Sequence, residues 1–383
     1  MGSNQYGDLL KLFNKCGLDL IDASTSALNT LEVDQRKFQV NLQKYINEKK
    51  HLLPNLIEQI KNYLDDDDNF VMSLLPCKNA NDSVSSHSSF QDNVLKLLLE
   101  LDELQNELFD YLIEKTVSIC ETSDDLSAVR DILNMKVNLL TYTINQFRYQ
   151  PKIVDPESLC KKLIDLIKMV SSSFVKKELI SCFPDILSDS SHDCVSSVLE
   201  ELLDDLELLN TTLDTLSNLK FKAGNTMSIV EKLFDKYEII DQADFAALCK
   251  FIIKASVSLN SKDLLNRLRL KLSFEDVESE KARFMIFDTI REFFQISNSL
   301  TELYLGLINQ LLLDNQTKAN ETNVQLKPFD IIAFSVLYTM TQQFKNVDKI
   351  FKQLLKCLSL SSLKRLFILT FKLGDSLMRE LFV

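Results

Sequence analysis

Residues 244–272 read DFAALCKFIIKASVSLNSKDLLNRLRLKL and contain two stretches of helical periodicity separated by a short polar break. In the first stretch, apolar residues recur at three- and four-residue steps, at Phe245, Leu248, Cys249 and Ile252. This spacing places them on one face of an α-helix. A second helix opens at Ser261, and its inward-facing residues are Leu264, Leu265, Leu268 and Leu272. The segment therefore predicts two amphipathic helices joined by a tight turn at Asn260 and Ser261.

The same pattern continues on both sides of this segment. Asp155 and Pro156 are typical of the cap and the first position of a helix, and apolar residues follow at helical steps as far as Val170. The breaks between such stretches are short and polar, as at residues 171–173, 188–191 and 223–225. Helix pairs of roughly 35–45 residues are typical of HEAT and armadillo-like solenoids. An irregular helical bundle is the alternative, but we favour the solenoid because a single core stops growing beyond roughly 250–300 residues.

The composition also favours an all-α fold. The chain has 383 residues but only six glycines and six prolines. Average usage would give roughly 27 and 19 at this length. Because sheets and barrels use glycine and proline in their turns and bulges, so few of them argue against these folds. We therefore predict an all-α protein, an α-solenoid of HEAT or armadillo-like helix pairs.

The distribution of polar residues suggests three parts. Residues 1–75 are expected to form an N-terminal helical segment, residues 76–89 a polar loop, and residues 90–383 a helical-repeat solenoid. A second polar loop at residues 314–327 is expected to interrupt this solenoid. The chain ends on an apolar stripe that includes Leu377, Leu381 and Val383. Because a solenoid ends in a polar capping unit, we expect that further units are missing or that another surface covers this stripe.

Charge and cysteine usage narrow the function classes. The formal net charge is −12, which disfavours nucleic-acid binding by the whole surface. However, residues 341–383 contain eight Lys or Arg and only three acids, so a local basic region remains open. The eight cysteines form no C-x-x-C motif and have three histidines as possible partners, so no zinc-site spacing exists. Scattered cysteines without a signal peptide suggest a reducing compartment.

No membrane segment and no cofactor or catalytic motif is visible in the sequence. The longest apolar stretch, residues 329–340, is too short to span a bilayer and contains Asp330. Glycine-rich phosphate loops and a nucleophile elbow are absent. We interpret the SHDC stretch at residues 191–194 as a solvated turn, and the four aspartates at 65–68 as a helix end with Asp68 or Asn69 capping the next helix. The sequence therefore predicts a non-enzymatic protein without cofactor, metal or small-molecule substrate.

One group of basic residues is a candidate for contacts with a phosphate backbone. Arg267, Arg269 and Lys271 lie on the polar side of the helix that opens at Ser261, and Lys364 and Arg365 lie in the basic C-terminal region. Together they could line a groove that follows a nucleic-acid backbone. The alternative is an ordinary solvated helix face.

Several segments, in order, resemble one known family. They are VDQRKFQVNLQKYI (33–46), LDDDDNFVMSLLPC (64–77), NQFRY (145–149), FPDILSDSSHDCVSSVLEELL (183–203), LDTLSNLKF (213–221) and the segment 244–272. This series resembles the N-terminal helical solenoid of the Fanconi anaemia group D-two family. The likeness is strongest over residues 145–272, and no single block is a catalytic signature.

The resemblance implies a non-enzymatic scaffold of nuclear DNA interstrand-crosslink repair. Members of the family pair with a paralogous solenoid, the Fanconi anaemia group I protein, and the pair embraces double-stranded DNA. Monoubiquitination by an E3–E2 ligase module then locks the pair as a clamp, and the acceptor lysine lies beyond the matched region. A nuclear location follows from the resemblance alone. The alternatives are a generic HEAT-type adaptor for transport or chromosome organisation and a helical enzyme with a dispersed site.

The resemblance also suggests a ubiquitin-binding site. Phe183 and Pro184, with Leu202 and Leu203, resemble the Phe-Pro and Leu-Leu pairs of a CUE-type ubiquitin-binding helix set. In that interpretation, exposed Phe183 and Leu202 contact the apolar patch of ubiquitin. The preferred alternative is structural, since a proline at a helix end and a buried leucine pair are ordinary features of a solenoid.

Overall fold

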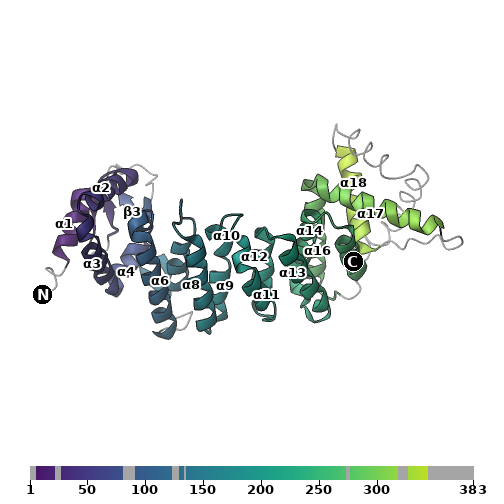
Figure 1. Ribbon diagram of the computed structural model, residues 1–383, viewed down its shortest axis with the longest axis horizontal. Helices are drawn as coiled ribbons and strands as arrows, with labels where there is room; N and C mark the ends of the chain where they lie inside the picture. The colour runs from purple at the N-terminus through teal and green to yellow at the C-terminus, as the bar shows by residue number, and fades with distance from the viewer. Residues whose placement is uncertain are drawn as a thin grey trace. The chain divides into compact units, whose positions relative to one another are not determined.

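The computed structural model describes residues 6–21, 27–80, 91–122, 129–132, 135–272, 277–317 and 327–343 (Figure 1). These residues are mainly helical, which confirms the predicted all-α fold class. The chain divides into two compact units, Met1–Val195 and Ser196–Val383, and each is described by itself. The predicted boundaries at residues 75 and 90 do not coincide with this division and stay a prediction.

The first unit opens with four helices around a small sheet. The helices are α1 (Gly7–Cys16), α2 (Gln35–Glu48), α3 (Leu53–Asp65) and α4 (Asp67–Leu74), with the 3-10 helix η1 (Lys50–Leu52) before α3. The sheet has the order β1 (Leu18–Asp19), β2 (Thr30–Leu31), β3 (Pro76–Asn79) and β4 (Gln91–Asn93). The pair β2–β3 is parallel, and the other two pairs are antiparallel.

The predicted polar loop at residues 76–89 does not begin at residue 76. Its first four residues, Pro76–Asn79, form the strand β3 and pair with other strands. Asn29 stabilises this arrangement, since its side-chain amide donates to the carbonyl of Met72 at 3.0 Å and its oxygen accepts from the amide of Ile21 at 3.0 Å. The contact with Met72 joins segments 43 positions apart, and such a pairing leaves no local pattern in the sequence. Residues 81–90 lie outside the described residues.

The rest of the first unit is a stack of helices in which α6 packs on α8 and α7 packs on α9. Asp155 caps α8 as predicted, because its side chain accepts a hydrogen bond from the amide of Ser158 at 3.0 Å. The elements are α5 (Val94–Leu99), α6 (Asp102–Thr122), β5 (Val129–Ile132), β6 (Met135–Asn138), α7 (Leu139–Ile144), η2 (Asn145–Phe147), α8 (Pro156–Met169), α9 (Ser173–Ile180), α10 (Phe183–Ile186) and η3 (His192–Val195).

The second unit shows the two layers expected of a solenoid. In one layer α12 packs on α14, α14 on α16 and α16 on α18, while in the other α11 packs on α13 and α15 on α17. Such packing of each helix on the next-but-one is what stacked helix pairs produce. The elements are α11 (Ser196–Leu202), α12 (Leu209–Asn218), α13 (Ala223–Asp235), η4 (Tyr237–Ile239), η5 (Gln242–Asp244), α14 (Phe245–Ser258), α15 (Lys262–Lys271), α16 (Glu280–Ile296), α17 (Asn298–Thr317) and α18 (Pro328–Gln343).

The helix pair predicted at residues 244–272 is α14 and α15. All eight apolar residues assigned to its inward faces are buried. The turn contains Asn260 in the left-handed conformation, with φ of 48°, which asparagine tolerates better than most residues. Ser261 then caps α15, because its hydroxyl accepts from the amide of Leu264 at 3.3 Å. The local sequence therefore determines both helices and the turn between them.

Ion pairs connect successive helix pairs of the second unit. Lys250 on α14 contacts Asp214 on α12 at 2.5 Å, and Arg267 on α15 contacts Glu231 on α13 at 2.5 Å. Both pairs join residues 36 positions apart. This offset equals one helix pair and falls within the expected unit length.

Two expectations fall partly or wholly outside the described residues. The predicted loop 314–327 begins inside α17, which continues to Thr317. Residues 318–326 and the C-terminal region from 344 onward, including the predicted apolar stripe, lie outside the described residues. In the portion that the structure does describe, no helix combines the length and apolar character needed to cross a bilayer.

Candidate interaction surfaces

Arg267, the first basic residue predicted to contact phosphates, is engaged by the helix pair before it. Its guanidinium donates to both carboxylate oxygens of Glu231, at 2.5 and 2.8 Å, and lies 4.1 Å from the centre of the Phe234 ring. These two hydrogen bonds lower the pKa of Glu231 and raise the pKa of Arg267, so both groups remain charged at neutral pH. Arg267 therefore connects α15 to α13.

Arg269 corrects the prediction that it faces a phosphate groove. Its side chain is 4% exposed and pairs with Asp330 of α18, whose side chain is fully buried. The Nε atom of Arg269 donates to both carboxylate oxygens of Asp330, at 2.8 and 2.9 Å. Because the charge that balances Arg269 lies 61 positions later, the sequence around α15 contains no sign of its burial. Arg269 is a core residue and is not available to a phosphate.

The carboxylate of Asp330 accepts two further hydrogen bonds. The phenol of Tyr304 donates to Oδ1 and the backbone amide of Lys327 donates to Oδ2, both at 2.8 Å. Phe294 and Phe329 contact the Tyr304 ring at centroid distances of 5.3 and 5.8 Å. Burial, and then the charge of Asp330, raise the pKa of Tyr304 well above its ordinary value. The cluster therefore holds α15, α17 and α18 together.

Lys271, the third of the α15 residues predicted to contact phosphate, also has partners. Its Nζ atom lies 3.2 Å from a carboxylate oxygen of Glu238 and 5.1 Å from the centre of the Tyr237 ring. Lys364 and Arg365 lie outside the described residues. The three α15 cations predicted to contact phosphate thus all contact neighbouring elements. Contact with phosphate stays a prediction for Arg267 and Lys271, which are more exposed than Arg269. It also stays a prediction for Lys364 and Arg365.

The four residues predicted to bind ubiquitin fall into different compact units. Phe183 and Pro184 begin α10 in the first unit, whereas Leu202 ends α11 and Leu203 follows it in the second. Phe183 and Leu203 are both 0% exposed, while Pro184 and Leu202 are half-buried. Because the Phe183 ring lies inside the first unit, it is not exposed as ubiquitin binding requires. The burial of this residue favours the structural interpretation.

The candidate chemical clusters resolve into local contacts. Asp66, rather than Asp68 or Asn69, caps α4 by accepting from the amides of those two residues at 3.1 and 3.0 Å. In the SHDC stretch, the Ser191 hydroxyl donates to Glu157 at 2.7 Å, and His192 is buried with Nε2 3.4 Å from the carbonyl of Leu187. Among the described residues, no group of three or more His, Cys, Asp or Glu side chains is placed to hold a metal ion.

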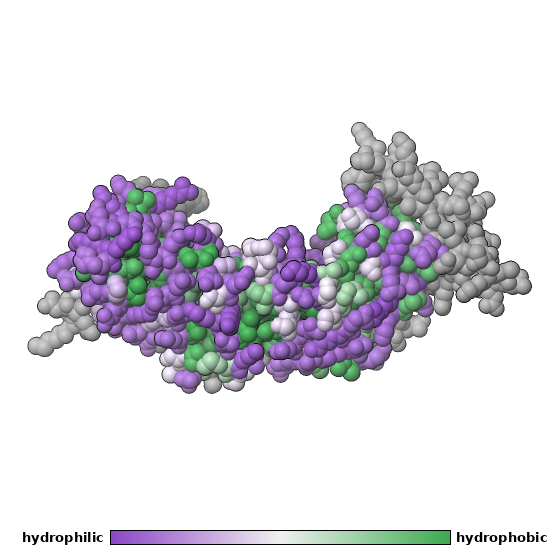
Figure 2. All heavy atoms as spheres, in the orientation of Figure 1, coloured by the Kyte–Doolittle hydropathy of each residue, from purple (hydrophilic) through white to green (hydrophobic). Residues whose placement is uncertain are grey.

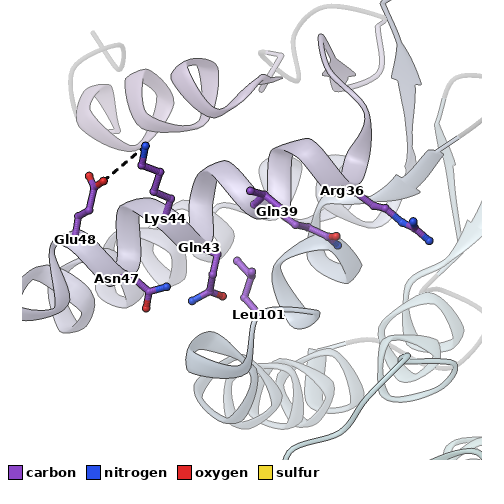
Figure 3. Close-up of a pocket in the computed structure, with 8 residues that line it drawn as sticks. Arg36, Gln39, Gln43, Lys44, Asn47, Glu48 and Leu101 are labelled. Atoms are coloured by element: carbon purple, nitrogen blue, oxygen red, sulfur yellow. Dashed lines mark ion pairs between the residues drawn. The ribbon is translucent and has the colours of Figure 1, made fainter.

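The helix α2 has an exposed polar face, not predicted from the sequence, beside an open hollow of about 730 Å³ (Figure 3). Arg36, Lys37, Lys44, Asn47 and Glu48 are all exposed on it. The labelled side chains in Figure 3 follow α2 from Arg36 at one end to Asn47 and Glu48 at the other, with Leu101 from the neighbouring segment. Figure 2 shows a largely hydrophilic surface over α1, α2 and α3. Counting helical positions in residues 35–48 would have revealed this face.

A stripe of amide side chains joins α2 to acidic residues of the following elements. The side-chain amide of Gln35 donates to Asp92 at 3.4 Å, that of Gln39 to Glu100, and that of Gln43 to Glu103 at 2.8 Å. The spacing of four residues places these glutamines on one line along the helix. They fix one side of α2 to β4 and to the segment that follows it, and they leave its basic side exposed.

Comparison with known proteins gave consistent matches. A family model described as "Fanconi anaemia protein FancD2 nuclease" matches residues 4–278. The Fanconi anemia group D2 protein homolog of Mus musculus is 25% identical over 378 residues, covering 90% of this chain and 25% of that protein. The Rattus norvegicus homolog is 24% identical over 378 residues, covering 90% and 24%, and the Gallus gallus protein 22% over 359 residues, covering 85% and 24%. The chain spans about a quarter of the length of these curated relatives.

Proposed function

This chain belongs to the FancD2 family of Fanconi anaemia proteins, and from that premise we propose that it is the N-terminal helical part of a scaffold for DNA interstrand-crosslink repair. The observation that carries the proposal is the family match over residues 4–278, which includes every element from α1 to α15. Stacked helix pairs support a scaffold role, since they present extended surfaces on which other molecules can bind. The mechanism is one of shape and contact.

The proposed partner is the paralogous solenoid, the Fanconi anaemia group I protein, in a heterodimer that encloses double-stranded DNA. An E3–E2 ligase module then attaches ubiquitin to a lysine outside this chain and stabilises the closed pair. The proposed location is the nucleus. Contacts with DNA in such a pair are made to the phosphate backbone and do not read the base sequence.

Co-expression of this chain with the group I protein tests the pairing. We expect the two proteins to elute together in size-exclusion chromatography, and we expect unrelated HEAT-type solenoids not to elute with the chain. The alternative function is a generic HEAT-type adaptor for transport or chromosome organisation. Stable elution with a transport cargo or a chromosome-organising complex, and no elution with the group I protein, would favour that alternative.

The proposal that the chain has no enzymatic activity needs its own test, because the description of the matching family model contains the word nuclease. Labelled linear and branched DNA are incubated with the purified chain and either Mg²⁺ or Mn²⁺, the cations used by two-metal nucleases. We expect no cleavage above that of a heat-denatured sample. Cleavage that rises with protein concentration and stops on chelation of the metal would overturn this part of the proposal.

A further inference from the structure

The exposed face of α2 gathers its positive charges into a narrow arc. At 3.6 residues per turn, Arg36, Lys37 and Lys44 fall within about 100° of one another around the helix axis. Val40 and Asn47 lie inside the same arc, Glu48 lies about 20° outside it, and all six side chains are exposed. The 14 residues of α2 make a helix about 21 Å long. The face is therefore a straight, basic strip along the whole helix.

The charges on this strip are available to a ligand. In the part of the chain that the structure describes, the side chains of Arg36 and Lys37 have no hydrogen-bond or ion-pair partner. Lys44 has only a loose contact with Glu48 at 3.9 Å, and the two side chains are 75% and 61% exposed. Such an exposed pair contributes little free energy and is easily replaced by another anion. Lys49 and Lys50, which follow α2, are also exposed.

The uncharged residues of the strip indicate the kind of ligand. Val40, 65% exposed, is the one large apolar side chain that α2 exposes. A helix that binds a bilayer needs a broad apolar face, and so does a helix that docks in a groove of a protein. Cations beside amide groups instead suit phosphate oxygens, since Arg, Lys, Asn and Gln supply many of the phosphate contacts to DNA. Asn47, which lines the adjacent hollow, adds such a donor beside the cations.

We propose that the exposed face of α2, formed by Arg36, Lys37, Lys44 and Asn47, binds the phosphate backbone of double-stranded DNA. The assignment rests on the proposed scaffold function and names the surface of this chain that serves it. Over about 21 Å a duplex presents about twelve phosphate charges, one per ~1.7 Å of its axis. The strip therefore meets enough charge for several simultaneous contacts.

A matched pair of triple variants tests the assignment in the full chain. The variant Arg36→Gln, Lys37→Gln, Lys44→Gln removes three charges from the strip. The control Lys11→Gln, Lys161→Gln, Lys168→Gln removes three exposed charges from α1 and α8. Glutamine keeps good helix propensity, so far-UV circular dichroism should be the same for all three proteins. Affinity is measured by fluorescence anisotropy with a labelled duplex over a range of salt concentrations.

We expect the α2 variant to lose at least about tenfold in affinity, and the magnitude of its salt slope to fall by about one for each lost phosphate contact. The control should bind like the wild type. Wild-type affinity in the α2 variant would overturn the α2 assignment and leave the proposed scaffold function intact. Failure of the wild-type chain to bind duplex DNA at low salt would also overturn the α2 assignment, while the scaffold function is tested separately by elution with the group I protein. A variant that loses binding to phosphatidylserine-rich vesicles but keeps duplex binding would assign the strip to a membrane instead.

Discussion

The helix α2 contains three basic residues and α15 contains four, but the structure uses those residues in different ways. On α15 the last three contact neighbouring elements: Arg267 binds Glu231, Arg269 binds Asp330 and Lys271 binds Glu238. On α2 the cations are exposed, and among the described residues their one acidic contact is the loose pair of Lys44 with Glu48. The comparison teaches that the number of basic residues in a helix does not determine its capacity to bind anions. That capacity depends on whether acids elsewhere in the chain already balance the charge.

The largest effect is expected where a buried α15 charge loses its partner. We predict that Asp330→Ala lowers the free energy of unfolding by about 3–5 kcal/mol, because it leaves Arg269 buried without a counter-charge. On α2, Arg36→Ala should change the free energy of unfolding by less than about 0.5 kcal/mol. Urea denaturation followed by circular dichroism measures both. The milder Asp330→Asn serves if the alanine variant does not fold, and a loss below about 1 kcal/mol in either would contradict the contrast.

The protonation of Tyr304 extends the comparison to the pH dependence of stability. Its pKa is raised by burial and by Asp330, so the folded state holds the phenol proton more tightly than the unfolded chain, in which tyrosine titrates near pH ~10. The resulting stability is present below that pH and is lost as the pH rises further. Tyr304→Phe should cost about 1.5–3 kcal/mol at neutral pH for the lost hydrogen bond to Asp330.

The same variant should also show a smaller loss of stability above pH ~10 than the wild type, because the buried phenol no longer titrates. Unfolding curves at neutral and alkaline pH measure this difference. An identical alkaline loss in Tyr304→Phe and the wild type would mean that this phenol does not contribute to the pH dependence.

The pair of Arg267 with Glu231 lies between the two extremes, since the side chains are 33% and 48% exposed. A double-mutant cycle with Arg267→Ala and Glu231→Ala should give a coupling free energy of about 0.5–1 kcal/mol, typical of a partly exposed pair with good geometry. High salt should reduce this coupling by screening. A coupling free energy that does not change with salt would mean that this pair behaves like the buried pair of Arg269 with Asp330 and not like a surface pair.

The smallest effect is expected for the loose pair on α2. Lys44→Ala should change the free energy of unfolding by no more than about 0.3 kcal/mol, because the contact with Glu48 is long and largely exposed. The matched variant Lys250→Ala, which removes the 2.5 Å contact with Asp214, should cost more. Equal losses in the two variants would show that the inter-helix pairs of the second unit are no stronger than the α2 contact.

Local features of the fold could be predicted from the sequence, and features that depend on distant contacts could not. The apolar periodicity at residues 244–272 determines α14 and α15, and Asp155 caps α8 as expected. The small sheet was missed because β2 and β3 pair across more than forty intervening residues. Arg269 was misplaced because Asp330 lies 61 positions away. The α2 face depends only on helical spacing, so it could have been predicted from residues 35–48 alone.

The constant offset of 36 residues between Lys250 and Asp214, and between Arg267 and Glu231, has a consequence for how this part of the chain can change in length. One residue inserted inside a helix turns every later side chain by about 100° around the axis, which separates the acid from the base. An insertion in a connecting turn, or duplication of a whole helix pair, preserves the alignment of opposite charges. We therefore expect this unit to tolerate insertions and deletions best in its turns, or as complete helix pairs.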